Sequence, residues 1–588
     1  MWPELPGRGK VSRRLRRPRI GRVARLVPTP KEVVPLSPKR RKKVLLTSVC
    51  RPLGESAGDS PSVGYELLHC QVTRAQGIFS PRSHHIHFGL EYIAQNLEAP
   101  TVVLQYPSKR ELIRELKKGY DIIGLSFVLP TFHRVKEAVA IIRAHAPDAQ
   151  IVFGGYGTVL GDEVLRPYCD HICREEGVGF MRRLLGEAEI PLPYDHPMIV
   201  NPLRVFGQQV GRTGIVFGGL GCPHGCDFCC TSHFFKRKHI RLLPTGADIY
   251  GVIRRYLDVD PNMSILVIDE DFLLNRKRAM ELRDCVQAGG VPLSIFVFAS
   301  IKALTQYSVT EILEMGIDGM WIGYEGTRSG YSKQQGRPVG DIFREFRAHG
   351  ISILASMIVG FPYQTPEIIE EELTGLLDLH PDLGQFLIYG PSPGTPFYDS
   401  VMKQGLLHQE YVDDPELYYR KACGFYSMVR HPSMSPGQIE AAQKRCFDED
   451  FRRLGPSIFR ALETWLLGHL KLKDSPSAYL RAKSASFAAD LRRSYPVFLA
   501  GRLLGPTRKV RRWIGELEAR VHAALGKPTL VERALSVAAI GAAAWTGVKL
   551  KLGLFQHVPL KRGEWRMAET PRSLSAPSPE VRVVAGAP

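Results

Sequence analysis

Hydrophobic residues in the first third of the chain form short apolar runs separated by stretches of helical periodicity. The apolar runs predict strands at 43–49, 101–106, 121–127 and 150–153. Amphipathic stretches between them predict helices at 87–97, 108–118 and 132–145. Alternating strands and helices are typical of a parallel, doubly wound α/β sheet, which binds ligands at the carboxyl ends of its strands. We therefore expect a Rossmann-like domain over residues 43–190.

A second series of apolar runs follows a proline-rich stretch. Prolines at 191, 193, 197 and 202 predict an irregular connection between two domains, because neither a helix nor a central strand tolerates them. Six runs then recur with helical segments between them, at 214–217, 264–268, 294–298, 319–324, 351–359 and 385–389. This pattern predicts six β-α units over residues 205–400, with ligands at the carboxyl ends of the strands.

The remainder of the chain has a different pattern. Residues 401–455 are interpreted as a linking or capping region, and residues 456–570 as a basic, helical C-terminal module. The run 534–548 is almost wholly apolar, but its 15 residues are shorter than a membrane span of about 20. Alternating apolar and cationic patches predict a module that lies on an anionic membrane surface or presents a lipid-like substrate. Packing against the rest of the protein is the alternative.

Charge is concentrated at the two ends of this 588-residue chain, whose formal net charge is +19. Residues 1–43 carry 15 Lys and Arg against 2 acidic residues, and residues 456–588 carry 22 against 9, so the middle is mildly acidic. Proline and charge deny residues 1–42 a helix and a core, so we expect a basic disordered tail there and a second disordered tail at 571–588. A basic tail can contact anionic lipid or nucleic acid, or simply remain solvated.

Three cysteines carry the strongest chemical signal. Cys222, Cys226 and Cys229 form a CxxxCxxC triplet directly after the run at 214–217. Three thiolates on one loop can bind three irons of a 4Fe-4S cluster, which leaves the fourth iron open to a small molecule. A structural zinc site needs four ligands, usually as two separated pairs, and no second pair is evident. The adjacent Cys230 does not easily share one tetrahedral site with Cys229.

The triplet, with Phe228 before its last cysteine, resembles the cluster motif of the radical S-adenosylmethionine (SAM) superfamily. The resemblance implies a partial (β/α)6 TIM barrel over residues 205–400, in which the cluster cleaves SAM to a 5′-deoxyadenosyl radical. By position in that family, the SAM-binding candidates are Phe228, Glu325, Asp269, Asp271 and Gly360. Capping of the helix that begins near Arg276 is an equally weighted interpretation of Asp269 and Asp271.

The domain before the barrel resembles the cobalamin-binding domain of a large subclass of that superfamily. The resemblance rests on glycine-rich and polar strand ends, and it implies that the cobalamin-binding candidates are Ser126, Gly154, Gly155, Tyr156, Glu175 and Gly177. The DxHxxG motif, whose histidine binds cobalt, is absent, because His84, His85 and His87 have the wrong spacing. We expect those three histidines to belong to a loop and a helix start that bind no metal, and cobalamin to bind without a lower protein ligand.

These resemblances imply an enzyme with three cofactors: the cluster, SAM and cobalamin. Its most favoured reaction is methyl transfer to an unactivated carbon, with a small molecule of lipid-like character as the expected substrate and an external electron donor such as a flavodoxin or ferredoxin. No catalytic side chain is assigned. Radical cyclisation or carbon-carbon bond formation is the first alternative, and an RNA-modifying or RNA-binding protein is the second, although nucleic acid is a less favoured partner. The odd cysteine count and an oxidation-sensitive motif predict a reducing cytoplasm. The basic C-terminal module adds a peripheral membrane location as a further expectation.

Overall fold

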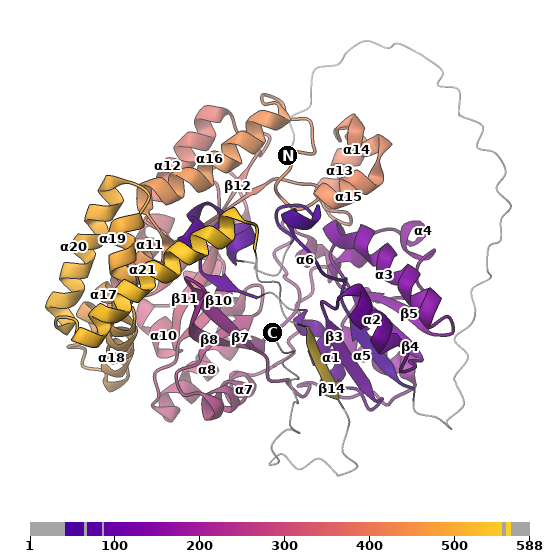
Figure 1. The fold of residues 1–588 in the computed structure, drawn as a ribbon, viewed down its shortest axis with the longest axis horizontal. Helices are drawn as coiled ribbons and strands as arrows, with labels where there is room; N and C mark the ends of the chain where they lie inside the picture. Colours follow the sequence, from indigo (N-terminus) through magenta and orange to yellow (C-terminus); the bar gives the residue numbers. More distant parts are fainter. Residues whose placement is uncertain (1–41, 64–67, 85–86, 555–559, 566–588) are drawn as a thin grey trace. The chain divides into compact units, whose positions relative to one another are not determined.

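The computed structural model describes residues 42–63, 68–84, 87–554 and 560–565 (Figure 1). The chain divides into two units, Met1–Arg41 and Lys42–Pro588, and all of the described residues belong to the second. The predicted disordered tails at 1–42 and 571–588 lie outside the described residues, apart from Lys42.

The first sheet has the strand order β14-β3-β1-β4-β5-β6. Its members are β1 (Val44–Thr47), β3 (Thr101–Gln105), β4 (Ile122–Ser126), β5 (Gln150–Gly154), β6 (His171–Ile172) and β14 (Lys561–Trp565). All pair in parallel except β14, which runs antiparallel to β3. The chain leaves β1 toward β3 and then returns to β4 on the other side, so the order reverses between β1 and β4. In such sheets, ligands bind at this reversal, beyond the carboxyl ends of the strands.

Helices cover both faces of this sheet because its strands are apolar on both sides. Val44 and Leu46 face α1 (Phe88–Gln95) and α5 (Gly177–Leu185). The alternate residue Leu45 faces the opposite layer, formed by α2 (Lys109–Leu116) and α3 (Phe132–His145). The predicted doubly wound fold is confirmed, and the predicted start of α2 is too, since Ser108 and Glu111 form a reciprocal capping box.

The second sheet has the order β13-β12-β11-β10-β9-β8-β7-β2. Six strands are parallel: β8 (Gln208–Phe217), β9 (Ser264–Ile268), β10 (Ile295–Ala299), β11 (Ile317–Glu325), β12 (Ser352–Val359) and β13 (Leu383–Ile388). Helices follow the first five of them: α7 (Gly246–Val259), α8 (Arg276–Gly289), α10 (Val309–Glu314), α11 (Val339–Ala348) and α12 (Pro366–Asp378). Because β13 and β2 end the sheet without pairing to each other, the predicted partial (β/α)6 barrel is confirmed.

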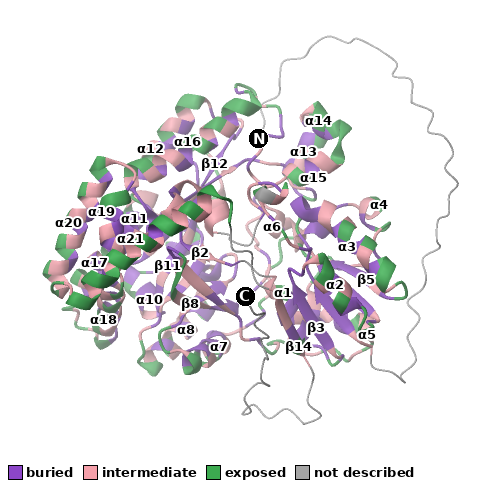
Figure 2. Cartoon of the chain, in the orientation of Figure 1, coloured by how far each residue is buried: buried purple, intermediate pink, exposed green. Residues whose placement is uncertain are grey.

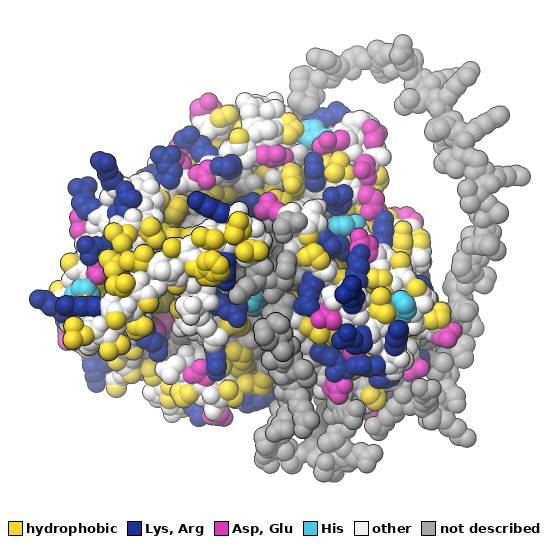
Figure 3. All heavy atoms as spheres, viewed as in Figure 1, with side chains coloured by type: hydrophobic (Ala, Val, Ile, Leu, Met, Phe, Trp, Pro, Cys, Tyr) yellow, Lys and Arg dark blue, Asp and Glu magenta, His cyan; other side chains and the backbone are white. Residues whose placement is uncertain are grey.

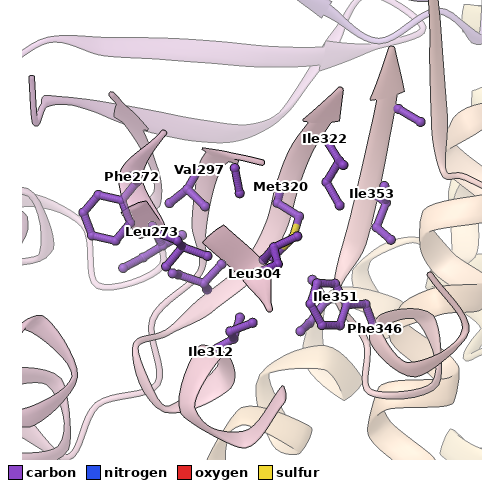
Figure 4. Packing of buried hydrophobic residues seen from close by; sticks show 14 of the residues in the cluster. Phe272, Leu273, Val297, Leu304, Ile312, Met320, Ile322, Phe346, Ile351 and Ile353 are labelled. Carbon is purple, nitrogen blue, oxygen red and sulfur yellow. The ribbon is translucent and has the colours of Figure 1, made fainter. Parts of the chain in front are cut away.

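The largest core lies between the barrel strands and their helices. Figure 4 shows strand residues such as Val297, Met320 and Ile353 packed together with Ile312 of α10 and Phe346 of α11. Figure 2 shows the strands buried and the outer helix surfaces exposed. Along β10 the other residues, Phe296 and Phe298, are only half-buried. Since strand side chains alternate between faces, these half-buried residues line the inside of the open barrel.

The proline-rich connection is more regular than predicted. A strand, β7 (Val200–Val205), lies antiparallel to β8 and contains Pro202 opposite Arg212. On its other side β7 pairs only with β2 (Arg82–Ser83), through Leu203 and Arg204. Pro202 therefore lies outside the two-residue pairing with β2. On the side of β7 that faces β2, the missing N–H of Pro202 costs no hydrogen bond between strands.

After the barrel, α13 (Pro396–Gln404), α14 (Gln409–Asp413), α15 (Pro415–Lys421) and α16 (Pro436–Leu454) lead to the C-terminal helices. These are α17 (Ser457–Leu472), α18 (Ala478–Arg493), α19 (Tyr495–Leu504), α20 (Arg508–Leu525) and α21 (Leu530–Lys551). The predicted helical C-terminal extension is confirmed, and after α21 the short strand β14 returns to the first sheet. None of the described helices combines the length and the apolar character that a transmembrane span requires.

Candidate functional site

The cysteine loop begins where β8 ends, at the carboxyl end of the first parallel strand of the barrel. Two glycines shape it, since Gly221 has φ 82° and Gly225 has φ 69°. A Cβ on Gly221 would lie 2.3 Å from the Lys238 carbonyl oxygen, so only glycine fits there. Ser232 joins the two halves of the loop, because its hydroxyl donates to the Cys222 carbonyl (2.7 Å) and accepts from the Gly225 N–H (3.0 Å).

The loop is also bound to the neighbouring strand ends. His224 Nε2 lies 2.6 Å from Asp271 Oδ2, and the Ser300 hydroxyl donates to the same carboxylate oxygen at 2.6 Å. His224 comes from the cysteine loop, Asp271 follows β9 and Ser300 follows β10. Asp271 thus holds the middle of the loop against two strand ends.

An acidic residue inside the triplet forms a second attachment. Asp227 accepts hydrogen bonds from the hydroxyls of Tyr331 (2.6 Å) and Tyr389 (2.8 Å). Both tyrosine rings contact the predicted SAM-binding residue Phe228 edge-on, with centroid distances of 5.4 Å and 5.8 Å. The sequence analysis missed this cluster, because the two tyrosines lie more than 100 residues downstream of the loop.

The three cysteines share one partly enclosed environment. Cys226 is buried, and Cys222 and Cys229 are half-buried. Burial, together with smaller contributions from the neighbouring cysteines of the triplet, raises the pKa of the Cys222 thiol to about 12 and that of Cys226 to about 11. Thiolates so placed require a compensating cation, which bound iron supplies. The donor set therefore fits a cluster. Within the described part of the chain, no three His, Cys, Asp or Glu side chains are arranged to bind a single metal ion.

Glu325 lies at the carboxyl end of β11 in a strained conformation, with φ 57°. It accepts a hydrogen bond from Lys333, whose ammonium group also lies 5.9 Å from the centre of the Phe228 ring. Burial alone would lower the pKa of Lys333, but Glu325 and the thiols of Cys226 and Cys229 hold it above its usual value. A carboxylate and an ammonium group are thus available beside the cysteine loop. Lys333 was not predicted from the sequence.

Asp269 is completely buried under the loop. One of its oxygens accepts a hydrogen bond from the buried Arg278, and the other lies 3.1 Å from His239 Nε2. Asp269 is thus hydrogen-bonded to Arg278 on one side and in contact with His239 on the other. The alternative that Asp269 or Asp271 caps the following helix is wrong, because Asn275 caps α8 by accepting from the Arg278 N–H. The predicted SAM contacts of both aspartates remain predictions.

Glu270, between these aspartates, was not singled out from the sequence. Burial raises its pKa to about 7, and the nearby Asp269 adds to the rise. Its Oε2 is buried without a hydrogen-bond partner among the described residues. Gly360, the last SAM candidate, follows β12 with φ 90°, and its N–H donates to Gln364 at 2.6 Å.

The cobalamin candidates at the ends of β4 and β5 lie together. The Ser126 hydroxyl is 3.2 Å from His87 Nδ1. A Cβ on Gly155 would lie 2.7 Å from the Phe127 carbonyl oxygen and 3.0 Å from Ser126 Oγ, whereas one on Gly154 would meet nothing within 4 Å. The structure thus leaves open space over the end of β5, next to the reversal of strand order.

Tyr156 connects this edge to the cysteine loop. Its ring contacts Phe234 and Phe235 edge-on, at centroid distances of 5.2 Å and 6.4 Å. Phe234 and Phe235 lie five and six residues after Cys229, at the end of α6 (Cys230–Phe234) and just beyond it. At a second point Phe88, the first residue of α1, contacts Phe217, the last residue of β8, at 5.8 Å. The carboxyl ends of the two sheets therefore face each other across the cysteine loop.

Glu175 and Gly177 lie farther along the same edge, after β6. The Glu175 carboxylate pairs with Arg183 at 2.6 Å, and a Cβ on Gly177 would lie 2.5 Å from Ile93 Cδ1. Gly177 thus permits close packing of α5 against α1. His84 is buried and 2.7 Å from Arg204, His85 lies outside the described residues, and His87 precedes α1 beside Ser126.

The fold and the site define a class of protein: a doubly wound sheet followed by an open (β/α)6 barrel with three cysteines after its first strand. No family model matches the chain. A solved structure of the radical SAM methyltransferase TsrM from Kitasatospora setae, with tryptophan substrate and a SAM analog bound, has the same fold, with TM-score 0.51 and 14% identity. The alignment covers 76% of this chain and 98% of that one.

Particular relatives are more similar in sequence. An uncharacterized methyltransferase of Pyrococcus horikoshii, PH0819, is 26% identical over 231 residues, which cover 37% of this chain and 48% of that protein. The anaerobic magnesium-protoporphyrin IX monomethyl ester cyclase of Rubrivivax gelatinosus is 22% identical over 392 residues, 58% of this chain and 67% of that protein. The chain thus spans about half to two thirds of these relatives. The predicted resemblance to cobalamin-dependent radical SAM enzymes is confirmed.

Proposed function

We propose that the chain is a radical SAM enzyme that uses a 4Fe-4S cluster, SAM and cobalamin to transfer a methyl group to an unactivated carbon. One observation carries the proposal. The carboxyl ends of the doubly wound sheet and of the barrel meet at the cysteine loop, through Tyr156 on one side and Phe234 on the other. Two cofactors bound at these two edges would face one substrate, and such proximity favours reaction over quenching.

In this proposal Cys222, Cys226 and Cys229 bind the cluster, and the open iron takes SAM. When bound, the cluster and SAM supply a radical that abstracts hydrogen, and cobalamin supplies the methyl group. In the same proposal, Glu325 would bind the ammonium or hydroxyl groups of SAM and its partner Lys333 would bind the carboxylate, by charge-assisted hydrogen bonds. Phe228 packs against Tyr331 and Tyr389 beside this position, and these rings would help to exclude water from bound SAM.

Cobalamin is proposed to lie over the ends of β4 and β5. Ser126, Gly154 and Gly155 present a hydroxyl and bare backbone there, and small residues allow a large ligand to approach closely. Tyr156 would then separate this ligand from the residues after the cluster. Glu175 and Gly177 would lie at the margin of the cobalamin site, since one pairs with Arg183 and the other packs on Ile93.

The proposed substrate is a small, lipid-like molecule. The half-buried residues inside the barrel include Phe296, Phe298 and Trp321, and the last two rings stack with centroids 5.2 Å apart. An apolar, aromatic interior favours an apolar substrate. The enzyme is proposed to work in the cytoplasm, in contact with an anionic membrane surface, and to receive electrons from a flavodoxin or ferredoxin.

Radical cyclisation is a second candidate, because one relative is named as a cyclase. The two reactions differ in product mass. A gain of one methyl group supports transfer, whereas loss of hydrogen without added carbon supports ring closure. Binding of RNA by the basic residues 1–43, most of which lie outside the described residues, would instead be seen as salt-dependent retention that their removal abolishes.

The cluster assignment is tested by comparing two adjacent cysteines. After anaerobic reconstitution, Cys226→Ala is expected to lose the brown iron-sulfur absorbance and all SAM cleavage, because it removes an iron ligand. Cys230→Ala lies next to the triplet but outside it, and should keep both. Intact SAM cleavage in Cys226→Ala would sink the proposal, and loss in both variants would show that the assay reports only disruption of the loop.

A further inference from the structure

Helix α21 turns its large hydrophobic side chains outward. The exposed fractions of its outward residues range from 42% to 82%, for Leu530, Val531, Leu535, Val537, Trp545 and Val548. No charged residue occurs between Ala534 and Val548. A helix on the surface of a globular protein normally turns its large hydrophobic side chains toward the core. In α21 these side chains face outward instead.

The inner side of α21 is made of small residues. Ala543 is its one fully buried residue among those described, and Ala539 and Ala542 pack beside it against the core of the C-terminal helices. Gly547 would place a Cβ 3.5 Å from Ile78, in the 3-10 helix η3 (Arg74–Phe79). The helix therefore packs closely along α19 and η3, and it is held flat against the protein while its large side chains stay outside.

Positive charge surrounds the apolar face. Glu532, the only acidic residue of α21, is paired with Arg492 at 2.7 Å, whereas Arg533 and Lys551 are exposed. Lys549 lies 5.6 Å from the centre of the Trp545 ring. Arg508, Lys509 and Arg512 are also exposed, at the start of α20, which packs on the far side of α19. Figure 3 shows hydrophobic side chains gathered over α21 and Lys and Arg side chains around the margin of this patch.

We propose that the outward face of α21 docks on an anionic lipid bilayer, with the helix axis parallel to the membrane. The 22 residues span about 33 Å, so the face forms a long apolar strip rather than a pocket for one molecule. Apolar side chains at the level of the acyl chains, with cations at the level of the phosphates, are typical of interfacial helices. Trp545 beside Lys549 is the pairing expected at the headgroup boundary.

This contact deepens the peripheral location named in the proposed function but does not rest on its chemistry. α21 also contacts η3, and the chain continues directly from η3 into β2, the strand at one open edge of the barrel sheet. A membrane-resident substrate would therefore enter the barrel from the side on which the helix docks.

The test measures co-sedimentation of the full chain with vesicles of phosphatidylcholine, with and without phosphatidylglycerol. The double variant Val537→Glu, Trp545→Glu should bind the anionic vesicles at least about tenfold more weakly than wild type. A matched control, Val259→Glu with Val412→Glu, adds the same charges at positions 66% and 51% exposed on α7 and α14, and should bind as wild type does. Circular dichroism should show that both variants are folded, since all four positions are exposed.

The Cys226→Ala variant separates this proposal from the proposed chemistry, because it should lose SAM cleavage and keep vesicle binding. Equal vesicle binding by the α21 variant and wild type would overturn the docking proposal. A second result would also overturn it: light scattering shows that wild type is a dimer and the α21 variant a monomer, and neither binds vesicles. The outward face of α21 would then be covered by a second copy of the chain. Loss of binding at high salt is expected, since the cations contribute to it.

Discussion

The two sheets end at the same junction, but their strand ends carry different chemistry. The barrel strands end in acidic residues that are already bonded within the protein: Asp269 to Arg278, Asp271 to His224 and Ser300, and Glu325 to Lys333. In the doubly wound sheet, β4 and β5 end in Ser126, Gly154 and Gly155, and the space beside Gly154 is open. The barrel edge thus holds the cysteine loop through hydrogen bonds within the protein, whereas the other edge presents bare backbone beside an open space.

The largest expected effect comes from breaking the buried pair on the barrel side. Asp269→Ala leaves the Arg278 guanidinium buried without its partner, so the free energy of unfolding should fall by about 3–5 kcal/mol in urea titrations. Asp284→Ala, which removes an exposed partner of Arg283 on the same helix, should change it by less than about 0.5 kcal/mol. Unchanged unfolding with weaker SAM binding in Asp269→Ala would reverse this interpretation and assign Asp269 to SAM.

On the other edge, two adjacent glycines sharpen the comparison. Gly155 has φ 83° and no room for a Cβ, so Gly155→Ala should lower the free energy of unfolding by about 1–3 kcal/mol. Gly154→Ala should leave it within about 0.5 kcal/mol, because its Cβ meets nothing. If cobalamin lies over the end of β5, both variants should retain less of it, as measured by the optical spectrum after reconstitution. Full retention by Gly154→Ala would contradict that placement.

A smaller effect tests the outer edge of the doubly wound sheet, where β14 pairs with β3. Burial alone would raise the pKa of Glu115, but hydrogen bonds from Arg562, Lys118 and Tyr120 lower it to about 2. Arg562→Ala should therefore lower the free energy of unfolding by about 1–2 kcal/mol at neutral pH. Because the pKa is depressed on folding, this difference should be complete above about pH 4.5 and vanish as the pH falls toward 2.

The control for this variant is Arg502→Ala, which breaks the ion pair between Arg502 and Glu518, and the arginine there is 51% exposed. It should change the free energy of unfolding by less than about 0.5 kcal/mol at any pH. If Arg562→Ala and Arg502→Ala changed the free energy of unfolding equally and independently of pH, the ion pair between Arg562 and Glu115 would not stabilise β14 on the sheet.

Much of the fold could be predicted because it depends on local patterns. The structure has α3 and β9 at the predicted residues. An amphipathic stretch predicts α3, and a short apolar run predicts β9. β14 was missed because its sequence, Lys-Arg-Gly-Glu-Trp, has no apolar run, and its partner β3 lies over 450 residues earlier. β7 was missed because a proline such as Pro202 normally argues against a strand. It is tolerated here because β2 pairs only with Leu203 and Arg204, and the sequence does not show that.

The candidate site could be predicted from the sequence only in part. The sequence alone determined the cysteine triplet, the six β-α units and the class of fold, because ligand spacing and hydrophobic period are properties of neighbouring residues. Only the tertiary structure decided that Asp269 bonds to Arg278, that Asp271 holds His224, and that Lys333 stands beside Cys226. Carboxylates look alike in a sequence, and burial and charge partners, which distinguish them, arise from contacts between strand ends that only folding brings together.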